Sequence, residues 1–238
     1  MKKYIVILGK QISWYSIMGF LGLGIATLFC VRRRDRYHLR RDDLINMMGY
    51  AIVGGLIGAK LLALLCMVPQ FVTYWDKITW NGEFIAAIMG NGFVFYGGLL
   101  GMLSAFGIYC AQYRINYKDV LELIAPAIPL FHVFGRIGCY IAECCGGING
   151  FPIQLVESGM NFGIFLLLYI LQNLQKMKGK TFFLYLLSYG IGRFILEFFR
   201  GDAERGFIWF FSVSQWISAG LIVVACFYLM KQREKARD

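Results

Sequence analysis

The sequence predicts an all-α polytopic membrane protein, and three observations support this fold class. Of the 238 residues, 58% are hydrophobic and only 16% are charged, and the mean hydropathy is +0.59. A soluble domain has about 25% charged and about 45–50% apolar residues. Seven apolar stretches approach or reach the length needed to cross a bilayer. Most basic residues gather between these stretches, as they do in loops that face anionic lipid.

Each predicted membrane span is an apolar run that a helix of about 20 residues explains. The first span ends at the basic run RRRDRYHLRR, the second contains Lys60, and the third begins at the glycine-rich GFVFYGGLLG. The fourth and sixth spans contain arginines, which lower their hydropathy. Together the spans form one integral membrane domain, 1–238, and cover roughly residues 12–31, 45–68, 92–112, 120–141, 161–175, 181–199 and 208–230.

The connections between the spans predict an N-terminus outside and a C-terminus in the cytoplasm. Basic loops favour the cytoplasmic side. With RRRDRYHLRR placed there, alternation places YRINYK, KMKGK and the C-terminal KQREKARD on the same side. The connections 69–91, 143–160 and 200–207 then lie outside. The apolar piece FIAAIMG at 84–90 is too short to span, so we expect it to be re-entrant or interfacial.

The net charge and the cysteines exclude two other classes of protein. The net charge of +10 is spread over short loops, which indicates a membrane surface rather than nucleic acid. Most of the seven cysteines are scattered through apolar segments, which argues against a secreted disulfide framework. The N-terminal MKKYIVILGKQISWYS lacks a full apolar core and a small-residue cleavage site, so we expect no removable signal peptide.

Two arginines, Arg136 and Arg193, fall inside apolar segments. An arginine at mid-bilayer costs about 2.5–3.5 kcal/mol even on the lenient insertion scale, so it normally faces a partner or a wet cavity. Tyr189, Arg193, Glu197 and Arg200 follow one another at intervals of four, four and three residues. On a helix this spacing places the four side chains along one stripe that carries a net positive charge.

This stripe has two interpretations. The pair formed by Arg193 and Glu197 is explained by itself as an ion pair that joins helices. With Arg136 and Lys60 added, an anion site is favoured, because a guanidinium group binds phosphate through two hydrogen bonds. These segments converge on the predicted outer leaflet, where a phospholipid headgroup is the most available anion. Glycines that permit close approach of the backbone accompany them at 97, 98, 101, 135, 138, 146 and 147.

Seven segments of the chain resemble the prolipoprotein diacylglyceryl transferases, in the family's order and approximate spacing. They are SWYSIMGFLGLGIA (13–26), GGLIGAKL (54–61), FYGGLLG (95–101), APAIPLFHVFGRIGC (125–139), PIQLVES (152–158), YGIGRFILEFFRGD (189–202) and SVSQW (212–216). The resemblance covers nearly the whole chain. Its most specific pieces are residues 135–147 and the block 189–202.

The resemblance implies a seven-helix bundle of the bacterial cytoplasmic (inner) membrane, with a lipid cavity open toward the outer leaflet. It implies transfer of the diacylglyceryl group from phosphatidylglycerol to the thiol of a lipobox cysteine in a secreted preprotein. Glycerol phosphate is released, and fixed guanidinium groups would stabilise the charge on this leaving group. No metal, nucleotide or other cofactor is implied. We expect a monomer that binds no nucleic acid.

The resemblance also implies which residues form the site. Arg136 and Arg193 would hold the lipid phosphate, and Tyr96 and Glu143 occupy the neighbourhood of the family's other catalytic positions. Lys60 stands where the family usually has arginine. The residues expected to shape the substrate site are Tyr15, Lys60, Gly97, Gly98, Asp119, His132, Cys139, Cys144, Gly147, Tyr189, Glu197 and Arg200.

The chain departs from the family at several of these positions. Tyr96 replaces the usual histidine, and a tyrosine with a pKa near 10 is a poor base at neutral pH. In the family motif G-R-x-G-N-F-x-N-G-E, Cys139 and Ala142 replace the two asparagines and Cys144 replaces the glutamate. Glu143 stands one residue earlier, which on a helix turns it by about 100°.

Three interpretations of Cys139, Cys144 and Cys145 remain open. The first is packing of small side chains in a bundle core, and the second is a redox pair or disulfide on the oxidising side. The third is a thiol that carries a lipid, or that binds a metal with His132. The spacing C-x₄-C-C is not a zinc motif, so the metal is the least favoured. His132 lies one turn before Arg136, on the same face. It either packs, orients that arginine, or acts as the base that Tyr96 cannot be.

These departures leave three hypotheses about function. The first is the transferase reaction itself. The second keeps the phospholipid site but uses another thiol, hydroxyl or amine as the acceptor. The third is a non-catalytic lipid-binding protein that retains the fold. The transferase reaction is favoured, because the motif order extends over nearly the whole chain.

Overall fold

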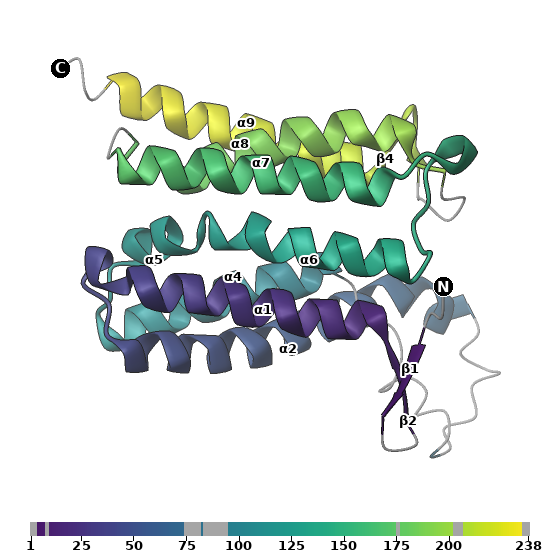
Figure 1. Ribbon diagram of the computed structural model, residues 1–238, viewed down its shortest axis with the longest axis horizontal. Coiled ribbons are helices and arrows are strands. Elements are labelled where there is room, and N and C mark those ends of the chain that lie inside the picture. The colour runs from purple at the N-terminus through teal and green to yellow at the C-terminus, as the bar shows by residue number, and fades with distance from the viewer. Residues whose placement is uncertain are drawn as a thin grey trace. The chain divides into compact units, whose positions relative to one another are not determined.

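The computed structural model describes residues 4–7, 10–73, 82, 95–174, 177–201 and 207–234. These residues are mostly helical, which confirms the predicted all-α membrane fold (Figure 1). Contacts divide the chain into a larger unit, Met1–Tyr37 with Lys118–Asp238, and a smaller unit, His38–Tyr117. The single domain expected over 1–238 stays a prediction.

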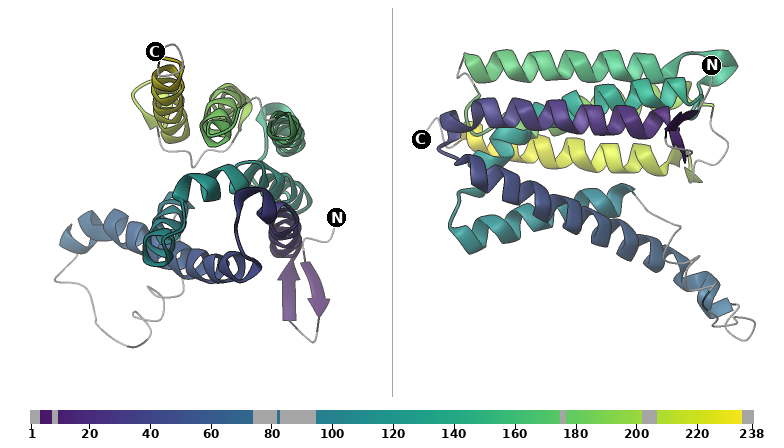
Figure 2. Two further views of the ribbon diagram at one scale, coloured as in Figure 1. Left: turned by 90° about the vertical axis from the view of Figure 1, so that its left-hand side faces the viewer. Right: turned by 60° about the horizontal axis from the view of Figure 1, so that its bottom comes forward.

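The larger unit is a row of long helices. Its elements are β1 (Tyr4–Ile7), β2 (Lys10–Ser13), α1 (Trp14–Arg33), η1 (Arg34–Tyr37), α5 (Tyr117–Ile124), α6 (Ala127–Ile141), η3 (Ile148–Gly150), α7 (Ile153–Asn173), α8 (Thr181–Leu196), η4 (Glu197–Phe199), β3 (Phe207–Ile208), β4 (Phe211–Ser212) and α9 (Val213–Glu234). Helices α1, α6, α7, α8 and α9 pack in that order, each against the next (Figures 1 and 2).

Helix α1 begins at a cap that the sequence supplies. The antiparallel hairpin β1–β2, in which Tyr4 lies opposite Ser13, leads directly into it. The Ser13 hydroxyl accepts a hydrogen bond from the Ser16 amide at 3.1 Å and so satisfies a backbone donor that the first turn leaves unpaired. Two arginines, Arg32 and Arg33, close the last turn, where a positive charge suits the helix dipole.

Six segments of the described residues are long and apolar enough to cross a membrane. They are Trp14–Tyr37, Arg41–Val68, Tyr117–Ile141, Ile153–Asn173, Thr181–Phe199 and Val213–Glu234. Helix α4 (Phe95–Tyr113) occupies the remaining predicted span, 92–112. The count of seven spans and their orientation stay predictions. The piece 84–90 lies outside the described residues.

The fifth span begins earlier than its hydropathy indicates. The sequence predicts it over 161–175 and assigns 143–160 to an outer connection, but α7 begins at Ile153. The first two turns of α7 carry the polar residues Gln154, Glu157 and Ser158, all of which are buried. Their polarity lowers the hydropathy of this segment although the bundle covers them, so the predicted boundary is wrong by eight residues.

The fourth span is also interrupted. The sequence predicts one helix over 120–141, whereas the structure has α5 and α6 with a break between Ile124 and Ala127. Pro126 lies in this break. A proline has no amide hydrogen and clashes with the preceding turn, so a helix is interrupted or kinked there.

Within the larger unit, the helix termini gather at two ends. The C-terminal ends of α1, α7 and α9 and the first turns of α5 and α8 share one end, which we call the basic end (Figure 1). The Arg33 guanidinium donates to Asn173 there, and the Tyr228 hydroxyl donates to the Gly179 carbonyl. The last turns of α6 and α8 and the first turns of α1, α7 and α9 share the opposite end (Figure 1).

The smaller unit consists mainly of α2 (Arg41–Thr73) packed against α4. Glycines let the two backbones approach closely. A Cβ placed on Gly54 would lie 2.7 Å from the Gly101 carbonyl oxygen, and one on Gly58 would lie 2.8 Å from the Gly101 Cα. Close backbone contact through small residues is typical of helix pairs in membranes. The Tyr109 hydroxyl further joins α4 to α2 by donating to Asp43 at 3.2 Å.

Candidate functional site

A buried cluster of arginines and glutamates lies at the end of the larger unit opposite its basic end. Glu157, on the second turn of α7, is its centre. One carboxylate oxygen lies 2.7 Å from Arg136 Nε, and the other lies 2.8 Å from Arg193 Nη1. A third guanidinium group, that of Arg200, lies 3.9 Å from the same carboxylate. One side chain of α7 thus gathers charged groups from α6, from α8 and from the segment after η4.

Arg193 is held from several sides. Its Nη2 lies 2.6 Å from Glu197, one turn further along the chain, which confirms the ion pair that the spacing of these residues predicts. The same nitrogen donates to the Ser214 hydroxyl on α9 at 3.3 Å. The two terminal nitrogens of Arg193 thus contact Glu157 on α7, Glu197 in η4 and Ser214 on α9. These three contacts fix the position of the guanidinium group.

The cluster keeps a net positive charge although it is buried. Among the residues that the structure describes, three arginines face two glutamates, which leaves one positive charge. The side chains of Glu157 and Glu197 are 3% and 2% exposed, and those of Arg193 and Arg200 are 9% and 10% exposed. Arg136 is the most accessible, at 24%. A fixed, partly desolvated guanidinium group is a strong site for an anion, since its interactions are screened less than in water.

Arg200 reaches the cluster by a different route from the one that its spacing predicts. Helix α8 ends at Leu196, η4 follows, and Arg200 has extended backbone angles, φ −82° and ψ 140°. The single helical stripe expected from Tyr189 to Arg200 is therefore wrong at its last member. Arg200 instead forms a β-bridge with Gly147, and the amide of the next residue donates to the Gly146 carbonyl at 2.9 Å.

The loop after α6 is tied to the same cluster. The Gln154 side chain, one turn before Glu157, donates to the Cys144 carbonyl at 2.7 Å. A Cβ on Gly147 would lie 3.0 Å from the Phe151 Cβ, so this glycine is needed for the close turn of the loop. Backbone pairing with the residues after η4 holds the loop from the other side. Gly147 therefore acts on the site through the backbone that it allows.

Aromatic rings line the cluster on the side of α6 and α8. The His132 and Tyr189 rings have centroids 5.4 Å apart, and Tyr189 stacks on Tyr185 with centroids at 5.7 Å. Tyr185 is buried within a hydrophobic cluster that includes Leu168 of α7. His132 and Tyr189, both expected at the site, thus form one continuous aromatic wall that the core of the unit supports.

Tyr15 and Cys139 lie at the contact between α1 and α6. A Cβ on Gly138 would lie 3.0 Å from the Met18 Cβ and 3.1 Å from the Tyr15 Cα, so the glycine allows the two helices to approach. Cys139 is buried beside it, whereas the Tyr15 side chain is 52% exposed. The Tyr15 backbone thus lies beside Gly138, two residues after Arg136 on α6.

The cysteines and Glu143 occupy the end of α6 and its loop. All three cysteines are free thiols, and the Cys144 Sγ donates to the Cys139 carbonyl at 3.6 Å. Packing, a disulfide and a lipid-carrying thiol all stay hypotheses for these cysteines. Burial raises the pKa of the Cys144 thiol, which disfavours its thiolate. Glu143 is exposed and has a left-handed φ of 53°, so the buried carboxylates of the cluster are supplied by other residues.

The remaining predicted site residues lie elsewhere in the chain. Asp119 is on the first turn of α5, at the basic end. It is therefore far from the arginine–glutamate cluster, which lies at the opposite end of the larger unit. Lys60 is half-buried on α2 of the smaller unit, and Gly97 packs there against the Gly58 carbonyl. A Cβ on the neighbouring Gly98 would lie 3.4 Å from the Gly55 carbonyl oxygen. The side chain of Tyr96 lies outside the described part of the structure.

Glu157 is the residue that sequence reasoning missed. It lies in PIQLVES, which resembles a family segment, but the hydropathy boundary at 161 assigned this segment to a loop. A carboxylate inside a helical span is costly and normally marks a partner or a site. Extending the helix back to Pro152 would have exposed this signal, because Glu157 then becomes an intramembrane charge beside two unexplained arginines.

Comparison with known proteins gives a family match over nearly the whole chain. Residues 3–231 match the model of the family described as prolipoprotein diacylglyceryl transferase. Proteins named phosphatidylglycerol–prolipoprotein diacylglyceryl transferase are similar over most of their length. The chain is 32% identical to the one from Clostridium tetani, with 92% of both chains covered, and 30% identical to that from Campylobacter curvus, with 94% and 92% covered.

A third relative of this name, from Clostridium perfringens, is 31% identical over 91% of this chain and 90% of its own. The family match extends over both units of the structure and includes each arginine and glutamate of the buried cluster. The chain therefore belongs to the prolipoprotein diacylglyceryl transferase family.

Proposed function

We propose that this protein transfers the diacylglyceryl group of phosphatidylglycerol to the thiol of a lipobox cysteine in a secreted preprotein. The observation that carries the proposal is the buried cluster around Glu157, which holds three guanidinium groups with one net positive charge. Its relatives are named for phosphatidylglycerol and prolipoproteins as substrates. A phosphodiester is the substrate group that such a cluster suits, because guanidinium groups bind phosphate oxygens in pairs.

The chemistry follows from the charge that develops in the reaction. The acceptor sulfur forms a bond to the glycerol carbon of the diacylglyceryl group, and the carbon–oxygen bond to phosphate breaks. The electron pair of that bond leaves with glycerol phosphate, and the thiol proton passes to a base. Positive groups that are already fixed where the leaving phosphate gains charge stabilise this transition state without reorganisation.

The residues of the cluster divide this work. Arg136, the most accessible of the three arginines, is the proposed contact to the lipid phosphate. Arg193 is more deeply buried than Arg136, and we propose that it supplies a second, fixed positive charge next to Arg136. Glu157 is a positioning residue, since its two oxygens hold both of these guanidinium groups. His132 and Tyr189 would form the wall beside the phosphate.

The test uses purified protein in vesicles that contain phosphatidylglycerol, with a synthetic lipobox peptide as acceptor. We expect the wild type to add a diacylglyceryl group to the peptide thiol and to release glycerol phosphate in equal amount. Arg136→Ala should lower this rate at least about 100-fold, the loss typical of removing one transition-state donor. Arg41→Gln, at an exposed arginine outside the cluster, is the matched control and should retain the rate.

The acceptor is tested separately from the lipid. Release of glycerol phosphate without modification of the peptide would contradict the lipobox thiol as acceptor while keeping the phospholipid site, and mass spectrometry of the lipid products would then identify the group modified. No release from phosphatidylglycerol, under conditions where the Clostridium tetani relative is active, would contradict the reaction. Tyr96→His combined with Cys144→Glu would then ask whether restoring the usual family residues restores transfer.

We also propose that the protein acts as a monomer in the bacterial cytoplasmic (inner) membrane, with the cluster toward the outer leaflet. The support is the distribution of charge at the basic end of the larger unit. Arg32, Arg33 and Arg36 lie in the last turn of α1 and in η1, and Lys178 and Lys180 directly precede α8. Basic residues of this kind favour the cytoplasmic side. The opposite end would then face the secreted acceptor. Accessibility of Cys145 to a membrane-impermeant thiol reagent in intact cells tests this orientation.

A further inference from the structure

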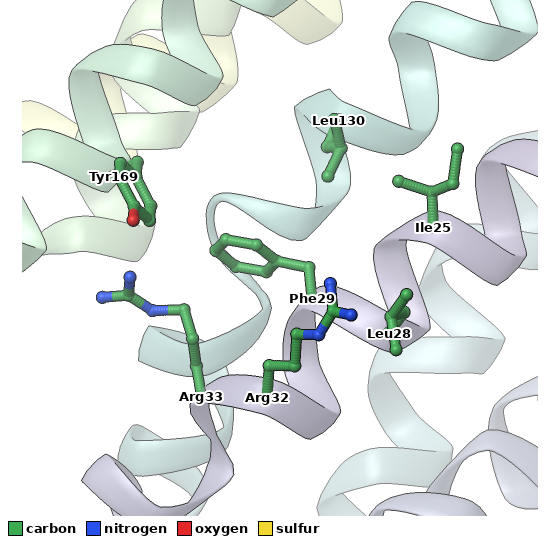
Figure 3. Close-up of a pocket in the computed structure, with 7 residues that line it drawn as sticks. All are labelled: Ile25, Leu28, Phe29, Arg32, Arg33, Leu130 and Tyr169. Atoms are coloured by element: carbon green, nitrogen blue, oxygen red, sulfur yellow. The ribbon is translucent and has the colours of Figure 1, made fainter.

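A pocket lies at the basic end of the larger unit, away from the arginine–glutamate cluster. It has a volume of about 280 Å³ and is formed by α1, α6 and α7 (Figure 3). Its walls are apolar on the side of α1 and α6, where they consist of Ile25, Leu28, Phe29 and Leu130. The Tyr169 ring closes it on the side of α7.

Two arginines border this apolar space. Arg32 and Arg33 are the last residues of α1, and both guanidinium groups lie beside the lining rings and aliphatic chains (Figure 3). Arg32 is exposed, with its charge available at the surface. Arg33 is half-buried, lies over Tyr169 with 4.8 Å from Cζ to the ring centroid, and donates to Asn173 Oδ1 at 2.9 Å. Arg33 is thus held in place at the pocket.

The Arg33 side chain also retains an unused donor. Its Nε is buried and makes no hydrogen bond to any of the residues that the structure describes. Leaving a buried charged donor unsatisfied is costly, so such an atom normally has a partner. An anionic oxygen at the arginine end of the pocket would supply this partner and would also pair with the exposed Arg32.

We propose that this pocket binds an anionic phospholipid of the leaflet at the basic end, with its phosphate at Arg32 and Arg33 and one acyl chain between α1 and α6. Basic pockets between membrane helices are typical sites for anionic headgroups. The apolar walls favour a lipid over free phosphate, because a small ion would leave them without a partner. The volume is just below the about 300–1,000 Å³ of pockets for whole drug-sized ligands, so it suits one chain segment rather than a complete lipid.

This lipid is a separate molecule from the one that reacts, because it binds at a different place from the proposed catalytic site. Arg32 and Tyr15 lie at opposite ends of α1, seventeen residues apart in the chain, and a helix of that length extends about 25 Å. The pocket and the catalytic cluster therefore lie near different leaflets. The bound lipid joins α1, α6 and α7 at the basic end, and its test does not depend on the transfer reaction.

The test uses the full chain in nanodiscs of phosphatidylcholine, with a trace of phosphatidylglycerol that carries a photoreactive diazirine on an acyl chain. After illumination, mass spectrometry measures labelling of the peptide that spans Ile25 to Phe29. We expect about tenfold more labelling than with a phosphatidylcholine probe that carries the same chain. Arg32→Gln should lower the phosphatidylglycerol signal to near the phosphatidylcholine level, because the exposed charge is lost.

Two further variants keep the result interpretable. Arg41→Gln removes an exposed arginine that does not line the pocket and should leave the labelling unchanged. Ile25→Trp fills the pocket but keeps both arginines, and should lower labelling of Phe29 by a similar factor in protein that melts at the wild-type temperature. Equal labelling by both probes, or an equal effect of Arg32→Gln and Arg41→Gln, would mean ordinary bilayer contact. Competition by millimolar inorganic phosphate would show a free-ion site. Either result overturns the proposal.

Discussion

Two buried glutamates of the larger unit, one at each end, hold helices together in different ways. At the basic end, Glu122 of α5 accepts hydrogen bonds from the Thr181 amide at 2.7 Å and from the Thr181 hydroxyl at 2.8 Å. Its own carbonyl accepts from Gln172 of α7 at 2.6 Å. At the opposite end, Glu157 is bound by Arg136 and Arg193. One carboxylate has neutral donors as partners, and the other has cations.

The difference indicates which end performs chemistry. Neutral donors from Thr181 satisfy the Glu122 carboxylate, so this glutamate joins the starts of α5 and α8 without gathering arginines around itself. Around Glu157 the cations outnumber the carboxylates, and one of them, Arg136, is 24% exposed. A buried ion pair is weak evidence for stability by itself. An excess of fixed positive charge beside an accessible arginine is what an anion site requires.

The largest expected effect is that of Arg193→Ala. This change leaves the carboxylates of Glu157 and Glu197 buried without their shared cation, and breaking a buried pair in this way costs about 3–5 kcal/mol. We expect the melting temperature in detergent to fall and transfer from phosphatidylglycerol to a lipobox peptide to fall at least about 1,000-fold. Both are measured on the same preparation.

The companion variant Arg193→Lys separates folding from chemistry. Lysine keeps the charge but cannot hold Glu157 and Glu197 with a planar fork. We expect most of the stability to return while transfer stays low. If transfer returned fully with lysine, the fork geometry of Arg193 would not matter, and only its charge would be needed.

A matched pair of variants, Glu157→Gln and Glu122→Gln, tests the comparison directly. Glu157→Gln frees two guanidinium groups from their positions, and we expect kcat to fall about 100-fold, as misplacement of reacting groups by about 1 Å does. The KM for phosphatidylglycerol should change less, because the positive charge remains. Glu122→Gln weakens two charge-assisted hydrogen bonds and should lower the free energy of unfolding by about 2 kcal/mol.

Activity per folded molecule distinguishes the two glutamates. Glu122→Gln should leave it unchanged once the folded fraction has been measured by thermal melting. Equal losses of kcat in the two variants would mean that Glu157, like Glu122, only holds the bundle together.

The smallest expected effect concerns Cys144, on the loop that the cluster ties down. Burial raises the pKa of its thiol, so the reactive thiolate is scarce at neutral pH and increases only as the pH rises through the raised pKa. We expect iodoacetamide to modify Cys144 more slowly at pH 7.5 than it modifies the same cysteine in denatured protein, as followed by peptide mass spectrometry. Cys144→Ala should change the transfer rate by about twofold or less, in keeping with a packing role. A large loss of transfer would instead make this thiol part of the reaction.

The fold class was predictable because it depends on sums over many residues. Apolar composition and span length require helices in a bilayer, since the backbone must satisfy its own hydrogen bonds there. The ends of the helices were predictable only where the sequence changes from apolar to charged at the point where the helix leaves the apolar layer, as at Arg32 and Arg33. The prediction failed at α7, because Gln154 and Glu157 are polar residues that other helices cover.

The candidate site was predictable in part for the same reason. Arg136 and Arg193 stand out as charges inside apolar runs, and the pair of Arg193 with Glu197 follows from local helical spacing. Glu157 lies far from both arginines in the chain, so no local pattern indicates their contact. The position of Arg200 could not be predicted either, because it depends on the β-bridge to Gly147, which forms between two irregular segments.

The sequence alone determined that this chain is a helical membrane protein of the diacylglyceryl transferase type with costly intramembrane arginines. Composition, hydropathy and motif order settle this, because each is a property of residues counted along the chain. Only the tertiary structure decided what those arginines meet. Partner choice depends on which helix faces touch, and that is fixed by the packing of α6, α7 and α8 around a carboxylate that the sequence placed in a loop.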